Sequence, residues 1–493
     1  MGYKAALLSL GCKVNSYETE KIREDLVEKN FEIVGFDEIA DVYIVNTCSV
    51  TNIADRKSRQ MLHKASAMNP LAIIVATGCY VQTEEKDEKL KEAADIVVGN
   101  NHKGEIADVI ISYLDEEKKK YTVTDPEEKN NKHSGNGSKD DSFTKSILDD
   151  ISCEKEVENF SINDYPERSR AFVRIEDGCN QFCSYCIIPY ARGRVRSRSE
   201  NEILDEVRSL AQKGFKEVVL TGIHISSYGV DNYEKMLKTK QKSNEAVDNA
   251  VSIPKREDQN GIVFNFDSTP LLKLIRKISF VDGIERIRLS SLEPRIITEE
   301  FVESLKDIPA FCPHFHLSLQ SGCNSVLKRM NRHYSAEEYL EKCRIIRECF
   351  DRAAITTDVI VGFPMESDEE FEESYTMCQE AAFAKMHIFK YSRRKGTVAD
   401  RMTGQLTEKE KHQRSLKMQE LDEEMQEKYI NSFLGDTVRI LVEEEVDGFY
   451  QGLTERYVQV RFKAEAQGLI NSIVPVRITG ISQKGVLMGV LEN

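Results

Sequence analysis

Three cysteines within eight residues constrain this chain more than any other feature: Cys179, Cys183 and Cys186. Their spacing is C-x₃-C-x₂-C, and they follow a strand-like run from Ala171 to Glu176. Thiolates this close in sequence can bind three irons of one cubane cluster, which leaves the fourth iron without a protein ligand. A zinc site, a disulfide pair and chance are the alternatives. Structural zinc sites usually take four ligands in two halves, and the next cysteine lies far downstream.

A second set of three cysteines is spread over the first eighty residues: Cys12, Cys48 and Cys79. Each one follows a predicted buried strand, at residues 4–10, 41–45 and 72–76. A helix is expected after each of the first two strands, from an N-cap at Asn15 to about residue 29 and then over residues 52–67. The carboxyl ends of parallel strands share one edge of a sheet, so these cysteines are predicted to converge on a second cluster. Three ordinary buried cysteines are the alternative, but they would not require the same position in three successive units.

The rest of the chain divides by its patterns into further segments. Residues 1–113 form the first α/β domain, and residues 114–164 are polar enough to predict a flexible linker. Residues 165–400 alternate strand and helix about six times, which predicts parallel βα units in a partial (βα)₆ barrel; a polar insertion covers 232–259. Active sites of such barrels lie at the carboxyl ends of the strands. A charged helix is expected within 401–434, and short alternating strands in 435–493 predict a small antiparallel β-barrel. The fold class is therefore multidomain α/β.

Length, charge and hydropathy limit the class of protein. A chain of 493 residues suggests about three domains, and a formal net charge of −15 argues against gripping nucleic acid with the whole surface. Four alternating arginines still predict a local basic groove: Arg192, Arg194, Arg196 and Arg198. No apolar run approaches the ~20 residues of a membrane span, and the start lacks a signal-peptide pattern, so a cytoplasmic protein is expected. The six remaining cysteines share no spacing and are expected to be buried free thiols.

The cluster loop carries a resemblance to a known family. Asp177-Gly178, the three cysteines and the tail from Ile187 to Gly193 resemble the cluster loop of radical S-adenosylmethionine (SAM) enzymes, and more narrowly that of the methylthiotransferases. The stretches 11–19 and 186–197 are most similar to the branch that modifies threonylcarbamoyladenosine beside the tRNA anticodon. Apart from the linker and the insertion, the whole chain resembles this family, with an N-terminal methylthiotransferase domain, a radical SAM barrel and a C-terminal TRAM domain.

This resemblance implies two 4Fe-4S clusters and SAM as cofactors. Cys179, Cys183 and Cys186 would hold the cluster whose free iron chelates SAM, and an electron delivered there would cleave SAM to methionine and a 5′-deoxyadenosyl radical. Cys12, Cys48 and Cys79 would hold the second cluster, which presents a methylthio group to C2 of the adenine. The implied partners are tRNA carrying threonylcarbamoyladenosine and an electron donor such as flavodoxin or ferredoxin. Association with a membrane is not expected.

Further site residues are expected at the strand ends and beside the loop. Walls of the SAM and substrate site are expected at five positions: Tyr185, Thr221, Gly222, Ser291 and Gln320. Each of them could equally serve only as a loop filler or a tight turn. Residues Arg192 to Arg198 are candidates for contact with RNA phosphates, against the alternative of a solvated charged stretch.

Three rival functions stay open at this point. Two are sister activities, on isopentenyladenosine in tRNA and on an aspartate of a ribosomal protein; their patterns prefer Gln or Pro where this chain has Lys13. The third is a non-catalytic iron–sulfur protein that binds RNA as a sensor, which would not need an open iron. The C-terminal segment adds a complication for RNA binding, because it is slightly acidic and contains Glu443, Glu444 and Glu445.

Overall fold

In the computed structural model the chain forms two compact units, Met1–Ile162 with Ile187–Arg194, and Asn163–Cys186 with Val195–Asn493. The structure describes residues 2–84, 88–123, 145–158, 160–163, 165, 169–231, 256–257, 263–264, 270–483 and 485–492. Most of the expected insertion at 232–259, and residues 124–144 of the expected linker, lie outside this set. No helix among the described residues has the length and apolar character needed to cross a membrane.

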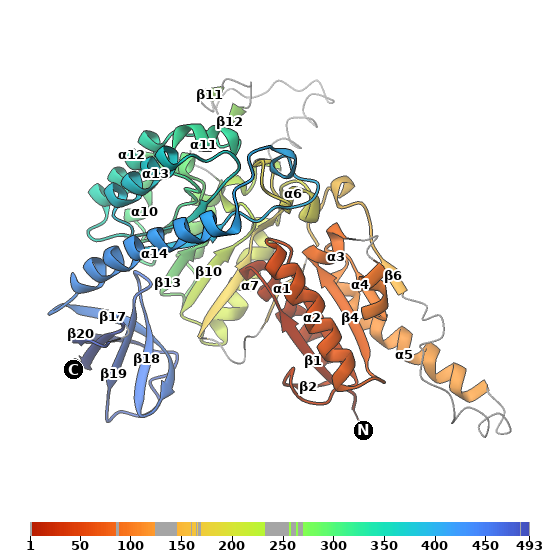
Figure 1. The fold of residues 1–493 in the computed structure, drawn as a ribbon. Helices are drawn as coiled ribbons and strands as arrows, with labels where there is room; N and C mark the ends of the chain where they lie inside the picture. Colours follow the sequence, from red (N-terminus) through yellow and green to blue (C-terminus); the bar gives the residue numbers. More distant parts are fainter. Residues whose placement is uncertain are drawn as a thin grey trace, which may run out of the picture. The chain divides into compact units, whose positions relative to one another are not determined.

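The first unit is built on a six-stranded parallel sheet in the order β2-β1-β3-β4-β5-β6 (Figure 1). Its elements are β1 (Lys4–Ser9), α1 (Lys13–Glu28), β2 (Glu32–Val34), β3 (Val42–Thr47), α2 (Asn52–Met68), β4 (Ile73–Gly78), α3 (Cys79–Thr83), α4 (Glu88–Ala93), β5 (Ile96–Val98), α5 (Ile106–Val123), β6 (Lys145–Ile147) and α6 (Ile188–Arg192). The predicted α/β domain is thereby confirmed.

Helices cover both faces of this sheet. Alternate residues of β3 and β4 pack with α1 and α5 in one apolar cluster, and the residues between them pack with α2 and α4 in another. Strands buried on both faces need apolar side chains at every position, which explains the continuous apolar runs in the sequence.

Two details differ from the sequence expectation. Helix α1 begins at Lys13, and its N-cap is Cys12, three residues before the expected cap at Asn15. The Asn15 side chain instead donates to the carbonyl oxygens of Leu10 (2.7 Å) and Thr47 (2.9 Å), which fixes the start of the helix to the ends of β1 and β3. Part of the expected linker is also structured, since β6 pairs in parallel with β5 and Ile147 packs against the core.

The second unit contains the predicted partial (βα)₆ barrel. Two three-stranded parallel sheets, β7-β10-β13 and β14-β15-β16, are linked by the bridges Ile287↔Phe311 and Leu292↔Leu317. The elements are β7 (Arg170–Arg174), β8 (Glu176–Asp177), β9 (Arg196–Ser197), α7 (Glu200–Gln212), β10 (Glu217–Thr221), α9 (Pro270–Ile278), β13 (Arg286–Leu289), α10 (Glu299–Lys306), β14 (His314–His316), α11 (Asn324–Arg329), α12 (Ala336–Cys349), β15 (Ala354–Val361), α13 (Asp368–Ala381), β16 (Lys385–Lys390) and α14 (Glu408–Asn431). Strands β11 (Arg256–Glu257) and β12 (Val263–Phe264) pair with each other in antiparallel fashion.

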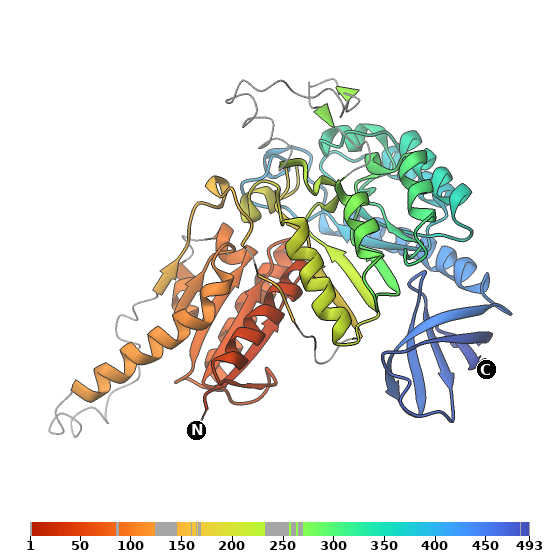
Figure 2. The same ribbon diagram turned by 180° about the vertical axis from the view of Figure 1, so that it is seen from behind.

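The C-terminal segment forms a closed five-stranded barrel in the order β17-β18-β19-β21-β20 (Figure 2). Its strands are β17 (Thr437–Val446), β18 (Phe449–Thr454), β19 (Gln459–Lys463), β20 (Ile473–Ile481) and β21 (Leu487–Leu491). The pair β19 and β21 is parallel, so the barrel is mixed, whereas the sequence had predicted a wholly antiparallel one.

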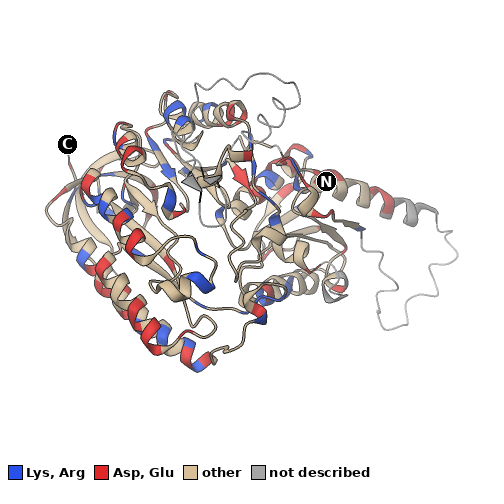
Figure 3. Cartoon of the chain, turned by 90° about the horizontal axis from the view of Figure 1, so that it is seen from above, with Lys and Arg blue, Asp and Glu red and all other residues tan. Residues whose placement is uncertain are grey.

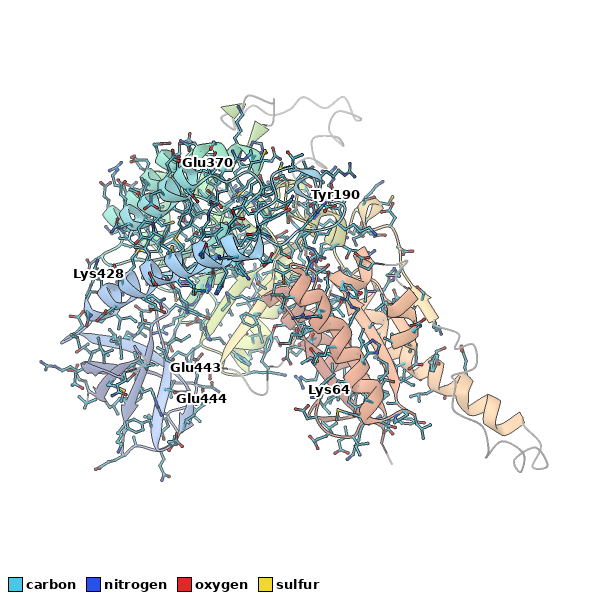
Figure 4. All side chains as sticks on the ribbon, viewed as in Figure 1. Lys64, Tyr190, Glu370, Lys428, Glu443 and Glu444 are labelled. Carbon is cyan, nitrogen blue, oxygen red and sulfur yellow. The ribbon has the colours of Figure 1, made fainter. Side chains whose placement is uncertain are left out.

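Arginines of β7 and β13 anchor this closed barrel. Arg286 donates to the carbonyl oxygens of Leu453 (3.0 Å) and Arg439 (2.8 Å). Arg288 donates to the Glu455 carbonyl (2.9 Å) and pairs with buried Glu217 (2.8 Å). Glu443 (Figure 4) pairs with Arg170 at 2.7 Å. Of the three consecutive glutamates noted in the sequence, Glu443 therefore helps to hold the closed barrel against the (βα)₆ barrel within the second unit.

Candidate functional site

The first cysteine triad lies in the loop that follows β7 and β8. Gly178 takes a positive φ of 82°, and its N–H donates to the Asp177 carboxylate at 2.8 Å, which turns the chain out of the strand. Ser184 holds the loop in place through backbone hydrogen bonds: its N–H donates to the carbonyl of Met330, just after α11 (3.0 Å), and its carbonyl accepts from Ala399, in the segment after β16 (2.8 Å). All three thiols are half-buried; burial raises the pKa of the Cys179 thiol, and Cys186 and Cys183 lie close enough to raise it further. The structure thus brings this triad together.

The donor set of this loop suits an iron–sulfur cluster. Two N–H groups point at its sulfurs, the Gln181 backbone at Cys179 Sγ (3.5 Å) and the Arg332 guanidinium at Cys183 Sγ (3.3 Å). Hydrogen bonds to sulfur stabilise thiolates, the form that binds metal. Among the described residues, no group of three or more His, Cys, Asp or Glu side chains is arranged around a single metal ion.

The carboxyl ends of the barrel strands adjoin this loop with a set of polar groups. Gly222 has Glu176 so close that a Cβ at residue 222 would lie 2.4 Å from the carboxylate, and this carboxylate accepts the His224 backbone N–H. The His224 ring faces Ser227 Oγ (2.7 Å) and the Gln181 amide (3.4 Å). Burial lowers the pKa of His224 to about 4, so its imidazole is neutral at physiological pH.

The other predicted wall residues occupy different environments. Thr221 is buried at the end of β10, and Gln320 takes a left-handed backbone (φ 72°) held by hydrogen bonds with Asp358 and Ile360, both 2.8 Å. Such backbone strain is often found at functional sites. Tyr185 packs edge-on against Phe363 at 6.5 Å, within an apolar cluster. Ser291 is half-exposed. The structure therefore adds Glu176, His224 and Arg332 to this site.

Those three residues were missed for different reasons. His224 had a weak signal, because it follows the Thr221-Gly222 strand end by two residues. Glu176 was read only as the end of a strand, and Arg332 carried no local signal at all, since its partner Cys183 is 149 residues away in the sequence.

The second cysteine triad forms at one edge of the first unit's sheet. Cys12 caps α1, Cys48 follows β3, and Cys79 begins α3 directly after β4. Gly11 approaches the triad so closely that a Cβ there would lie 2.6 Å from Cys48 Sγ. Each thiol lies near enough to the other two for their charges to interact, and burial, reinforced by nearby Cys79, raises the pKa of Cys48 to about 12. The predicted convergence of these cysteines is what the structure shows.

A buried arginine completes the surroundings of the second triad. Arg192, on α6, donates from Nε to Cys79 Sγ at 3.3 Å, and its other nitrogens reach the Glu18 carboxylate (2.8 and 3.0 Å) and Asn15 Oδ1 (2.5 Å). Glu18 also accepts from Lys103, whose side chain is buried as well. These residues fit an anionic cluster, because donors and positive charge converge on the thiols.

The expected basic groove takes a different form. Arg192 and Arg198 are fully buried and Arg196 nearly so; Arg198 pairs with Glu206 at 2.6 Å and Arg196 lies 3.8 Å from Asp177. A guanidinium inside the protein cannot reach an RNA phosphate, so the predicted phosphate contacts do not fit these three residues. Arg194 is exposed, and so is its neighbour Tyr190 on α6 (Figure 4). Elsewhere basic and acidic residues are interspersed along the chain (Figure 3).

Comparisons with known proteins agree with this geometry. Residues 173–378 match the model of the Radical SAM superfamily, and residues 4–99 match that of the Uncharacterized protein family UPF0004. Threonylcarbamoyladenosine tRNA methylthiotransferase MtaB of Aquifex aeolicus is 38% identical over 476 residues, covering 96% of this chain and 100% of that protein. MtaB of Bacillus subtilis is 34% identical, covering 96% and 93%. The tRNA-2-methylthio-N(6)-dimethylallyladenosine synthase of Acetivibrio thermocellus is 30% identical, covering 96% and 88%.

The (βα)₆ barrel, its cysteine loop and these matches define a radical SAM protein. Within that class, the chain belongs to the methylthiotransferases. Its family is the one that includes the threonylcarbamoyladenosine tRNA methylthiotransferases called MtaB.

Proposed function

We propose that this chain is a radical SAM methylthiotransferase that adds a methylthio group to C2 of N6-threonylcarbamoyladenosine at tRNA position 37, next to the anticodon. The observation that carries the proposal is the pair of separate cysteine triads, each at the ends of parallel strands. They occur in a chain that matches a threonylcarbamoyladenosine tRNA methylthiotransferase over 96% of its length. A sensor that only binds RNA has no need of two such triads with the barrel of a SAM enzyme.

Cys179, Cys183 and Cys186 would hold a 4Fe-4S cluster with SAM, and Cys12, Cys48 and Cys79 a second one. When bound, the first would pass on the electron that cleaves SAM, and the second would receive a methyl group from another SAM and present a methylthio group to the unactivated C2–H position. The electron itself requires an external donor, such as flavodoxin or ferredoxin. A cytoplasmic location suits a tRNA substrate.

The residues around the first triad prepare the site. The Arg332 guanidinium and the Gln181 N–H stabilise negative charge on two of its sulfurs. At Gly222 the missing side chain leaves room for the backbone to approach both Glu176 and a ligand. His224 stays neutral, so its ring offers one donor and one acceptor nitrogen; Ser227 and Gln181 orient it. Together with Thr221, Ser291, Gln320 and Tyr185 they are our candidates for the SAM and substrate walls.

The target adenine must be unstacked and turned out of the anticodon loop, because a stacked base cannot reach a half-buried cluster loop. Arg194 is the exposed arginine of the expected groove and our candidate for a phosphate contact. On the closed barrel, Arg461 and Lys463 both lie over the Phe449 ring, at 5.0 and 4.9 Å. A ring flanked by two cations combines stacking with phosphate attraction and is a second candidate for RNA contact.

The test is mass spectrometry of nucleosides from tRNA incubated anaerobically with reconstituted protein, SAM and a reductant. Two tRNA preparations are compared, one carrying threonylcarbamoyladenosine and the other isopentenyladenosine. We expect a methylthio gain on the first alone, lost in Cys183→Ala and in Cys48→Ala but kept in Cys349→Ala, which alters a half-buried cysteine outside both triads. A gain on isopentenyladenosine instead would make the substrate assignment wrong, and intact clusters without SAM cleavage would favour the sensor.

A further inference from the structure

One short segment belongs by its contacts to the first unit although it follows the first cysteine triad directly. Ile187 is the residue after Cys186, and residues Ile187–Arg194 group with Met1–Ile162. The segment is fixed there by the Asn100 side chain, which donates to the Ala191 carbonyl at 2.7 Å, and by Gly193, where a Cβ would lie 2.5 Å from the Ile151 carbonyl oxygen. Its helix α6 delivers Arg192 to the second triad.

Arg192 shares a buried carboxylate with a second cation. Within the described part of the first unit, these ion pairs bring one carboxylate, Glu18, to two cations, Arg192 and Lys103, and all three side chains are fully buried. Glu18 and Arg192 already match each other in two-point geometry. A buried cation that donates to a thiol is stabilised when that thiol carries negative charge. The adjacent thiols of Cys12, Cys48 and Cys79 become anionic when they bind metal, and they supply that charge.

We propose that Arg192 is a positioning residue that sets the reduction potential of the second iron–sulfur cluster. Its guanidinium donates a charge-assisted hydrogen bond to the Cys79 sulfur and places the positive charge of the buried ion pairs against the cluster. This inference rests on the second cluster of the proposed function. It assigns Arg192 to electron chemistry, where the sequence had suggested contact with RNA.

The direction of the effect follows from electrostatics. Adding an electron makes the cluster and its sulfurs more negative, so a buried cation that donates to one sulfur stabilises the reduced form more than the oxidised form. Replacing Arg192 by an uncharged residue of similar length should therefore lower the midpoint potential. We expect at least a tenfold loss in the reduction equilibrium, which is about 59 mV for a one-electron couple.

The experiment isolates the second cluster by changing Cys179, Cys183 and Cys186 to Ala in the full-length chain. In this parent protein we compare Arg192→Met, Arg192→Lys and Arg198→Met. Arg198 is the matched control, because it is equally buried and also pairs with a glutamate, but in the second unit. The readouts are iron per chain and the midpoint potential from a redox titration followed by electron paramagnetic resonance.

We expect Arg198→Met and Arg192→Lys to bind iron and keep the potential close to that of the parent, and Arg192→Met to move it negative. If Arg192→Met binds no iron while the other two variants do, Arg192 serves to assemble the site, and the proposed role in setting the potential is overturned. The proposal is overturned if an iron-loaded Arg192→Met keeps the parent's potential, if Arg192→Lys shifts as far as Arg192→Met, or if Arg198→Met shifts equally. A parent that binds no iron overturns the second cluster itself, and this inference with it.

Discussion

Gly78 offers the sharpest test of how the fold shapes the second cysteine triad. It ends β4 directly before Cys79 with φ 101° and ψ −170°, a conformation that is essentially restricted to glycine. A Cβ at this position would lie 2.4 Å from the carbonyl oxygen of Thr47 and 2.6 Å from Asn46 Oδ1. The first of these is backbone of β3, paired with Gly78 in the sheet, so it cannot move aside without disturbing the pairing. We therefore expect Gly78→Ala to loosen β3 and β4.

The magnitude has two parts. A residue with a side chain in this region costs about 1–3 kcal/mol in strain. Overpacking against a fixed neighbour costs typically another ~1–3 kcal/mol. Together they destabilise this edge of the sheet by about 2–6 kcal/mol, and even the lower figure corresponds to roughly a 30-fold change in an opening equilibrium.

Hydrogen–deuterium exchange measures this locally, which suits a chain of several domains where no single unfolding free energy is defined. Peptides covering β3 and β4 should exchange at least about 30-fold faster in Gly78→Ala than in the parent. The control is Gly396→Ala, a glycine with φ 90° but no atom within 4 Å of an added Cβ, which should leave β3 and β4 unchanged. Unaltered exchange in Gly78→Ala would show that the sheet edge can yield, and would refute the reasoning.

Three further predictions concern the second unit and the RNA. Arg288→Ala leaves Glu217 buried without this partner, a change that typically costs ~3–5 kcal/mol, so limited proteolysis should release the closed barrel faster than in the exposed-site control Arg344→Ala. The folded chain holds the pKa of His224 near 4 by burial, whereas an unfolded histidine titrates near ~6.5, so the unfolded segment binds an extra proton between these values. The local stability around β10 therefore falls as pH drops through this range, and His224→Gln should flatten this slope when hydrogen exchange of β10 is corrected for the intrinsic rate and followed against pH. Arg194→Ala should weaken tRNA binding at low salt and reduce the slope of log K against log salt by about 0.7–0.9, while exposed Arg208→Ala on α7 should leave both unchanged.

Periodicity was enough to predict the sheet, the (βα)₆ barrel and the placement of both cysteine triads. The cysteines at positions 12, 48 and 79 could be found because strand ends are visible locally and parallel strands impose a common edge. The strand β6 could not be predicted, because a three-residue edge strand forms through its pairing with β5 and has too little sequence of its own to show a pattern. The start of α1 failed for a related reason, since the Asn15 side chain prefers carbonyls of β1 and β3 to the helix cap.

Arg192 shows a deeper limit of sequence reading. A run with an arginine at every second position suggests an exposed basic stretch, yet the residue's environment depends on Glu18 and Cys79, which precede it by 174 and 113 positions. Burial of a charge is determined by partners, and partners so distant leave no trace in local pattern.

The grouping of residues Ile187–Arg194 with the first unit also limits how this protein can be taken apart. Residues 4–99 match a family model of their own, which suggests that the N-terminal domain can be expressed or exchanged by itself. A fragment that ended at residue 162 would lack Arg192, so Glu18 would lose this ion pair, and the Asn100 amide would lose the Ala191 carbonyl. Chimeras between relatives should therefore exchange residues 187–194 together with residues 1–162, because these two separate stretches of sequence form one structural unit.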